Sequence, residues 1–83
     1  MVIDLRTPDA FRKKRLLNST NMAQDDLTDE FIKKQKNPLL FVCETGGQSK
    51  KTSLLYRKAG AENVFYIKGG LTEWVNNSLP LSN

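Results

Sequence analysis

The longest uninterrupted apolar run in the chain, Leu39 to Cys43, has the length of a β-strand and falls far short of a membrane span. It is apolar at every position, which is typical of a central strand buried on both faces. Two further strands are predicted at Val2–Arg6 and Val64–Ile67, and the segments between the strands favour helices. This alternation predicts an α/β fold in which helices flank a parallel sheet.

Four helices are expected around these strands. Thr7 is a candidate N-cap, with Pro8 at the first position of a helix that reaches about Lys14. The other three helices are expected from Asp25 or Asp26 to Gln35, from a cap at Ser49 through Ala59, and from Leu71 to Asn76. Between them, Asn18–Met22 predicts a loop or a brief edge strand, Gly60 a left-handed helix end, and Gly69–Gly70 a turn.

The 83 residues are enough for one domain, so we expect a single domain over residues 1–83. The chain has no histidine, which excludes His-ligated metal sites and mechanisms that rely on an imidazole base. Its one cysteine, Cys43, excludes an internal disulfide and a thiolate-rich metal site, and we expect neither a metal nor a cofactor. Any covalent chemistry at sulfur is therefore assigned to Cys43.

The net charge of +4 favours anionic partners. Basic clusters at Arg12–Arg15, Lys33–Lys36 and Lys50–Lys51 suit RNA contact, docking of an acidic partner or steering of anionic substrates. Solvated helix faces are the simpler interpretation, and nucleic acid is not expected because no stacking aromatics are interleaved. Asp4 argues against a secretory signal, so we expect a cytoplasmic protein. Composition favours a monomer, an exposed sheet edge allows a weak dimer, and the short apolar runs predict no membrane contact.

Cys43 stands where the central strand ends and a loop with two glycines, Gly46 and Gly47, begins. In parallel α/β sheets, ligands bind beyond the carboxyl ends of the strands. The N–H groups of such a loop can converge on an anion, and the next helix adds a partial positive charge. We therefore expect the pKa of the Cys43 thiol to lie below its ordinary value. The alternative is that Cys43 is an inert small residue of the core.

Three segments occur in the order found in one known family. They are Asp4-Leu5-Arg6 with Phe11, the run Phe41-Val42-Cys43-Glu44-Thr45-Gly46-Gly47-Gln48-Ser49, and Ile67-Lys68-Gly69-Gly70-Leu71-Thr72-Glu73-Trp74 followed by Leu79-Pro80. With Lys58-Ala59-Gly60 and Asn63-Val64 between them, these segments resemble the rhodanese domain over nearly the whole chain. The resemblance implies a small rhodanese-type parallel sheet flanked by helices, without the strand and helix that usually come first.

The resemblance also implies sulfurtransfer. Cys43 would take a sulfane sulfur from thiosulfate or from a protein or small-molecule persulfide, hold it as a persulfide, and pass it to a thiol, cyanide or another protein. A thiolate that is already present needs no general base, in agreement with the missing histidine. The persulfide-binding loop is expected at Glu44, Thr45, Gly46, Gly47, Gln48 and Ser49, with electrostatic support from Lys50 and Lys51, while Asp4, Arg6 and Trp74 are expected to be structural.

The loop also departs from the family pattern. Many active members carry arginine directly after the cysteine and at the position of Gln48, and a protein persulfide is therefore the preferred donor here. An inward carboxylate of Glu44 would raise the pKa of Cys43. Glu44 is expected to point outward, because adjacent loop residues usually diverge. Phosphatases of the same fold carry arginine six places after the nucleophile, where this chain has Ser49, so phosphate chemistry is not expected.

Two other interpretations stay open. One is a non-catalytic rhodanese-like module that binds a protein partner or senses an anion through the loop. The other is a piece of a larger multidomain enzyme.

Overall fold

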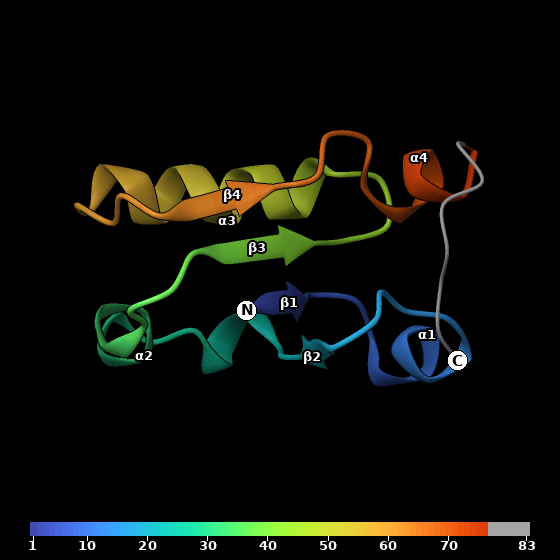
Figure 1. Cartoon of the computed structure of the whole chain (residues 1–83), viewed down its shortest axis with the longest axis horizontal. Helices are drawn as coiled ribbons and strands as arrows, with labels where there is room; N and C mark the ends of the chain where they lie inside the picture. Colours follow the sequence, from blue (N-terminus) through green and yellow to red (C-terminus); the bar gives the residue numbers. More distant parts are fainter. Residues whose placement is uncertain (77–83) are drawn as a thin grey trace.

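Figure 1 shows the computed structural model of the chain, in which residues 1–76 are described. The strands are β1 (Val2–Asp4), β2 (Ser19–Asn21), β3 (Leu39–Val42) and β4 (Val64–Tyr66). The helices are α1 (Pro8–Lys13), a 3-10 turn η1 (Gln24–Asp26), α2 (Asp29–Lys34), α3 (Gly47–Lys58) and α4 (Gly70–Asn76). The Leu79-Pro80 part of the family resemblance lies outside the described residues.

The four strands form one parallel sheet in the order β2-β1-β3-β4. Helical segments connect successive strands, so all strands point the same way and their carboxyl ends meet at one edge (Figure 1). The predicted parallel α/β fold is thereby confirmed. Asn18–Met22 does contain the brief edge strand, β2.

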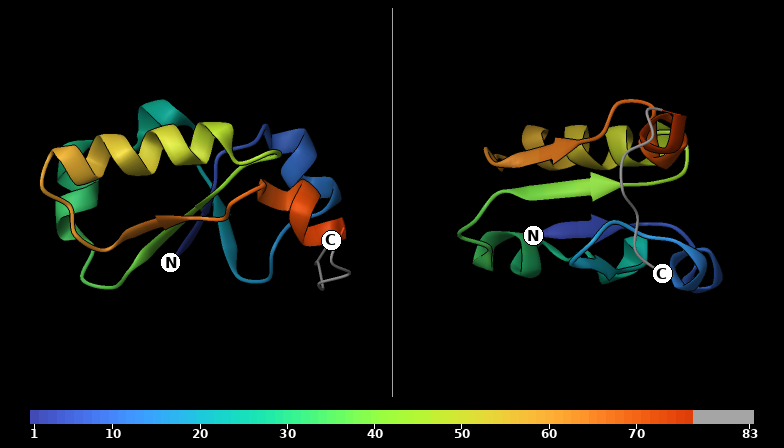
Figure 2. Two further views of the ribbon diagram at one scale, coloured as in Figure 1. Left: turned by 90° about the horizontal axis from the view of Figure 1, so that it is seen from above. Right: turned by 45° about the vertical axis from the view of Figure 1, so that its right-hand side comes forward.

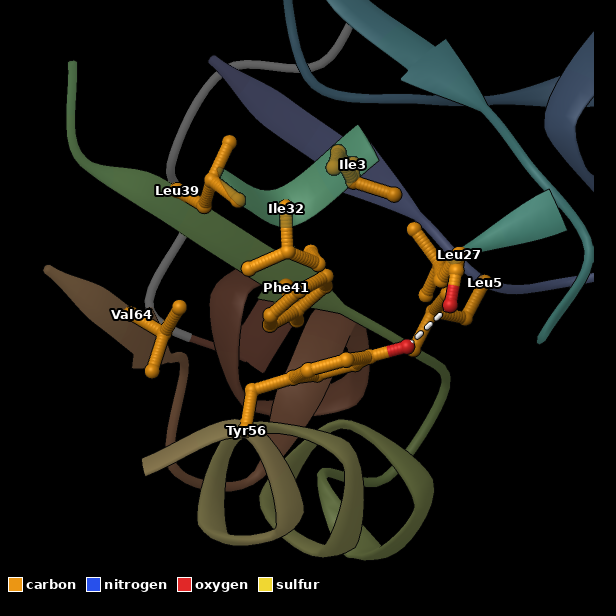
Figure 3. Packing of buried hydrophobic residues seen from close by; sticks show 8 residues of the cluster. All are labelled: Ile3, Leu5, Leu27, Ile32, Leu39, Phe41, Tyr56 and Val64. Atoms are coloured by element: carbon orange, nitrogen blue, oxygen red, sulfur yellow. Dashed lines mark hydrogen bonds between the residues drawn. The ribbon is translucent and has the colours of Figure 1, made fainter. Parts of the chain in front are cut away.

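The main core lies between the sheet and helices α2 and α3, as Figure 3 shows. Its members are Ile3, Leu5, Leu27, Ile32, Leu39, Phe41, Tyr56 and Val64. Phe41 and Tyr56 stack with their ring centroids 6.2 Å apart, and the Tyr56 hydroxyl donates a hydrogen bond to the carbonyl of Leu27. Tyr56 thus ties α3 to the connection before α2 and satisfies its own buried hydroxyl.

A smaller cluster covers the other face near the carboxyl ends of the strands, where α4 lies (Figure 2). It consists of Leu16, Val42 and Leu71, with Trp74 packed against it. The structural placement expected for Trp74 is therefore confirmed. Through Leu71, this cluster fixes the start of α4 beside the end of β3, and that contact positions the loop after Cys43.

Several element boundaries differ from the sequence prediction. Helix α2 is capped by Thr28, whose hydroxyl accepts the N–H of Phe31, and not by Asp25 or Asp26. Asp26 instead accepts the N–H of Ala23 and closes the 3-10 turn. Thr7 caps α1 as predicted, and Gly60 has the expected left-handed φ of 106°.

Helix α3 begins earlier than predicted. Its N-cap is Gly46, not Ser49, and Gly47 and Gln48 belong to its first turn instead of the loop. Gly46 has φ of 95°, a conformation that glycine adopts without the steric cost of a side chain. As a result Ser49 lies inside the helix and is fully buried, which turns its side chain toward Cys43.

Candidate functional site

The Cys43 sulfur lies beneath the loop that joins β3 to α3. The residue is 4% exposed. The N–H groups of Gly46 and Ser49 donate to its sulfur at 3.1 and 3.3 Å, and the Ser49 hydroxyl oxygen lies 3.3 Å from it. A chain turn and the first turn of a helix thus direct three polar groups at one sulfur atom.

The Ser49 hydroxyl can serve either protonation state of the sulfur. In the neutral form the thiol donates to the Ser49 oxygen, and the hydroxyl donates to the carbonyl of Gly46 at 3.2 Å. When the thiol loses its proton, the hydroxyl can rotate and donate to the thiolate instead. Hydrogen bonds to an ionised acceptor are stronger than neutral ones, so this rotation favours the thiolate.

The balance of forces at the sulfur lowers the pKa of Cys43. Burial alone raises the pKa, because it removes water from the charged form. Hydrogen bonds from the hydroxyl and the N–H of Ser49, and from the N–H groups of Gly46 and Gln48, act in the opposite direction and together outweigh burial. The direction agrees with the expectation from the sequence, and it increases the thiolate fraction at neutral pH.

The start of α4 holds the loop in this conformation. The N–H of Leu71 donates to the carbonyl of Cys43, and the N–H of Thr72 donates to the carbonyl of Glu44, both at 2.9 Å. The approach requires a glycine, because a Cβ on Gly70 would lie 2.5 Å from the Cys43 carbonyl oxygen and 2.6 Å from the Gly46 nitrogen. With its carbonyls bound to α4, the loop keeps its N–H groups directed at the sulfur.

Glu44 points away from the sulfur, as predicted. Its side chain is 64% exposed, and its carboxylate lies 3.6 Å from a guanidinium nitrogen of Arg6. Arg6 is itself held by the carboxylate of Asp4, which is 1% exposed, and by the carbonyl of Lys14. The structural pairing expected of Asp4 and Arg6 is confirmed.

Arg6 is the residue that sequence reasoning undervalued. The loop itself contains no cation, yet the guanidinium reaches it from the end of β1. The available signal was the position of Arg6 just after a strand that adjoins β3, since parallel strands end at the same edge. Two carboxylates share this one guanidinium, so the triad of Asp4, Arg6 and Glu44 carries a net negative charge.

The predicted loop residues divide into two groups. Gly46 and Ser49 are buried against the sulfur, whereas Thr45, Gly47 and Gln48 are exposed. Within residues 1–76 no hydrogen bond joins the Thr45 or Gln48 side chain to the sulfur, and Gln48 acts through its backbone alone. Lys50 and Lys51 are the fourth and fifth residues of α3, one turn into the helix, and their side chains are exposed.

A cavity lies at the other end of the sheet. Its volume is about 420 Å³, and its lining includes Leu39 and Val64, the first residues of β3 and β4, together with Tyr56. No residue of the Cys43 loop lines it, so it takes no part in chemistry at the sulfur.

Residues 1–76 contain neither a cluster of metal-binding side chains nor a helix that could span a membrane. No group of three or more Asp, Glu and Cys side chains lies close enough together to hold a metal ion. None of the helices has the length and hydrophobicity of a membrane span.

Comparison with known proteins places these features in context. The family model for the rhodanese-like domain matches residues 1–77. The uncharacterized protein YibN of Escherichia coli K12 is 32% identical over 98% of this chain, and the chain spans 59% of that protein's length. The thiosulfate sulfurtransferase GlpE of Glaesserella parasuis is 27% identical over 98% of this chain and 76% of that protein.

Solved structures agree at the level of the fold. The Rhodanese_3 like domain of the Anabaena sp. Alr3790 protein superposes with a TM-score of 0.79 at 24% identity and covers all of this chain and 98% of that one. A rhodanese-related protein from Thermoplasma volcanium gives a TM-score of 0.84 at 20% identity, over 99% of this chain and 82% of that one.

Proposed function

Because the chain belongs to the rhodanese-like domain family, we propose that it is a sulfurtransferase in which Cys43 carries a sulfane sulfur as a persulfide. One observation carries this proposal. The Cys43 sulfur accepts two backbone N–H groups and faces a hydroxyl, an environment that stabilises an anion on sulfur. The similarity to a relative named thiosulfate sulfurtransferase supports the same reaction class.

The proposed reaction has two displacement steps. The Cys43 thiolate attacks the outer sulfur of the donor, the donor's S–S bond breaks, and its inner part leaves with the electron pair as a thiolate or, from thiosulfate, as sulfite. An acceptor thiolate or cyanide then attacks the outer sulfur of the Cys43 persulfide, and the Cys43 thiolate leaves. The Cys43 thiolate is the nucleophile of the first step and the leaving group of the second, and it is a stabilised anion in both, so neither step needs a general base at Cys43.

The charges beside the loop favour a persulfide donor over thiosulfate. Arg6 is bound to Asp4 and Glu44 and is not free to clamp a dianion. The exposed Glu44 carboxylate directly after Cys43 repels a doubly charged donor more than a singly charged one. Cys43 is a free thiol, and thiols are kept reduced in the cytoplasm, which is the compartment we propose.

Intact-protein mass spectrometry tests the proposal. We expect the protein to gain the mass of one sulfur atom after incubation with a low-molecular-weight persulfide, and to gain less with thiosulfate. A reductant should remove the added sulfur, and Cys43→Ser, treated in parallel, should gain none. If the folded wild-type protein takes up no sulfur from either donor, the proposal fails.

Lys50 and Lys51 are proposed to support the thiolate electrostatically. They are the fourth and fifth residues of the helix whose N-terminus faces the sulfur. Replacing both by glutamine should raise the pKa of Cys43 and move the alkylation-versus-pH curve to higher pH, with a smaller effect at high salt. Lys33→Gln with Lys36→Gln removes the same charge far from Cys43 and should leave the curve in place. Coincident curves for all three proteins would show that the two lysines have no such role.

A second candidate is the non-catalytic binding module. The low exposure of Cys43, 4%, favours it, since a sulfur beneath its loop is poorly placed to meet a bulky donor. The two candidates differ in the reactivity of the thiol. A sulfurtransferase should be alkylated by iodoacetamide at about pH 6 faster than free cysteine, whereas a binding module should not.

A further inference from the structure

The net charge of the protein is concentrated at the end that contains Cys43. Helices α1 and α4, the start of α3 and the segments that follow the strands lie at this end (Figure 1). It holds eight basic residues against four acidic ones, namely Arg6, Arg12, Lys13, Lys14, Arg15, Lys50, Lys51 and Lys68 against Asp4, Asp9, Glu44 and Glu73. The other end, from η1 and α2 to the last turn of α3, holds five of each sign: Lys33, Lys34, Lys36, Arg57 and Lys58 against Asp25, Asp26, Asp29, Glu30 and Glu62.

At the Cys43 end, Asp4, Glu44 and Asp9 form their ion pairs with arginines, so these pairs leave the lysines of this end uncompensated. Arg6 binds both Asp4 and Glu44, and Arg12 binds Asp9. The lysines of this end are all exposed and form no ion pair among the described residues; they are Lys13, Lys14, Lys50, Lys51 and Lys68. The excess positive charge is therefore available to an external partner.

The apolar groups exposed at the same end suit a protein more than a nucleic acid. Leu17, between α1 and β2, is 72% exposed, and Val75 on α4 is 49% exposed. Both are aliphatic, whereas proteins that bind single-stranded nucleic acid stack bases on exposed aromatic rings. The aromatic rings at this end, Phe11 and Trp74, are half-buried, and Arg15 lies over the Phe11 ring.

We propose that this basic end docks an acidic surface of the protein that delivers the persulfide. The inference rests on the proposed function and names the class of its donor: a protein whose persulfide cysteine is surrounded by aspartate and glutamate. Charge complementarity of this kind orients the two proteins and speeds their encounter. Docking in this orientation places the donor persulfide beside the Cys43 loop. The charge complementarity between the two surfaces, and not the loop alone, then selects the donor protein.

The test separates binding from sulfur chemistry. The probe is a short labelled peptide in which acidic residues flank a serine at the position of the persulfide cysteine, and its affinity is measured by fluorescence anisotropy. One variant combines Lys13→Gln, Lys14→Gln and Lys68→Gln. The matched control combines Lys33→Gln, Lys36→Gln and Lys58→Gln, which removes the same three charges from the opposite end.

We expect the first variant to bind the acidic peptide about tenfold more weakly than the wild-type protein, and the control to bind it within about twofold. A peptide with lysines in place of the acids should not bind. Equal weakening in both variants would show that only net charge matters and would overturn the proposal. Tighter binding of a single-stranded RNA, lost in the same variant, would assign this end to nucleic acid and would also overturn it.

Failure of the docking proposal and failure of the proposed function are distinguishable. Uptake of sulfur by Cys43 from a small persulfide, without binding of the acidic peptide, would leave the function intact and overturn the docking surface. Binding of the acidic peptide by a protein that accepts no sulfur would support the docking surface and overturn the function.

Discussion

Replacing Gly70 by alanine should destabilise the protein by about 3 kcal/mol or more and abolish the enhanced reactivity that we propose for Cys43. The new Cβ would lie 2.5 to 2.6 Å from three backbone atoms, the carbonyl oxygens of Cys43 and Glu44 and the nitrogen of Gly46. None of these atoms can move alone, because all three belong to the loop that surrounds the sulfur. The loop must shift as a unit, and the hydrogen bond from the Gly46 N–H to the sulfur is lost with it.

Urea denaturation gives the change in the free energy of unfolding, and alkylation at about pH 7 gives the reactivity of Cys43. Gly60→Ala is the matched control, since Gly60 also has a positive φ but an added Cβ there would meet nothing within 4 Å. It measures the cost of the backbone conformation, about 1 kcal/mol. A Gly70→Ala variant as stable as Gly60→Ala, with Cys43 still reactive, would show that the close approach of α4 does not position the loop.

The sheet could be predicted because its signals are local. Leu39–Val42 is apolar throughout, and a central parallel strand is the common setting for such a run. Thr7 followed by Pro8 identified the start of α1, because an N-cap side chain accepts the N–H of a residue only three positions later in the chain. The position of Cys43 at the end of the central strand and before the loop followed from the same local pattern, a strand that ends in a glycine-containing loop.

The details of the site depend on contacts that the sequence does not display. Ser49 and Gly46 are both acceptable helix caps, and the left-handed φ that selects Gly46 is a property of the folded loop. The bond between the start of α4 and the carbonyl of Cys43, and the approach of Arg6 to Glu44, join segments far apart in the chain. Such contacts arise only when parallel strands place their carboxyl ends together, so local patterning cannot give them.

Loss of the Ser49 hydroxyl should slow alkylation of Cys43 at neutral pH by roughly tenfold, because a hydrogen bond to a charged group contributes about 1.5 kcal/mol or more. Burial raises the pKa of Cys43 and the hydroxyl is the first of the groups that lower it, so Ser49→Ala should move the pKa upward. The rate-versus-pH curve should shift to higher pH, and the two proteins should react at similar rates once both thiols are ionised. Alkylation reports this site directly, because Cys43 is the only cysteine.

The free energy of unfolding should also depend on pH, in the direction given by the lowered pKa of Cys43. A thiol whose pKa is lower in the folded protein than in the unfolded chain stabilises the fold above its unfolded pKa, about 8.5, and this contribution disappears as the pH falls through the folded pKa. The stability lost in Ser49→Ala should therefore be largest in alkaline solution and smaller in acid. Ser53→Ala is the control, since Ser53 is a buried serine of α3 whose hydroxyl donates to the carbonyl of Lys50 and does not contact the sulfur. Its loss of stability should not depend on pH, and an equal pH dependence in both variants would exclude the Ser49 hydroxyl as the group that stabilises the thiolate.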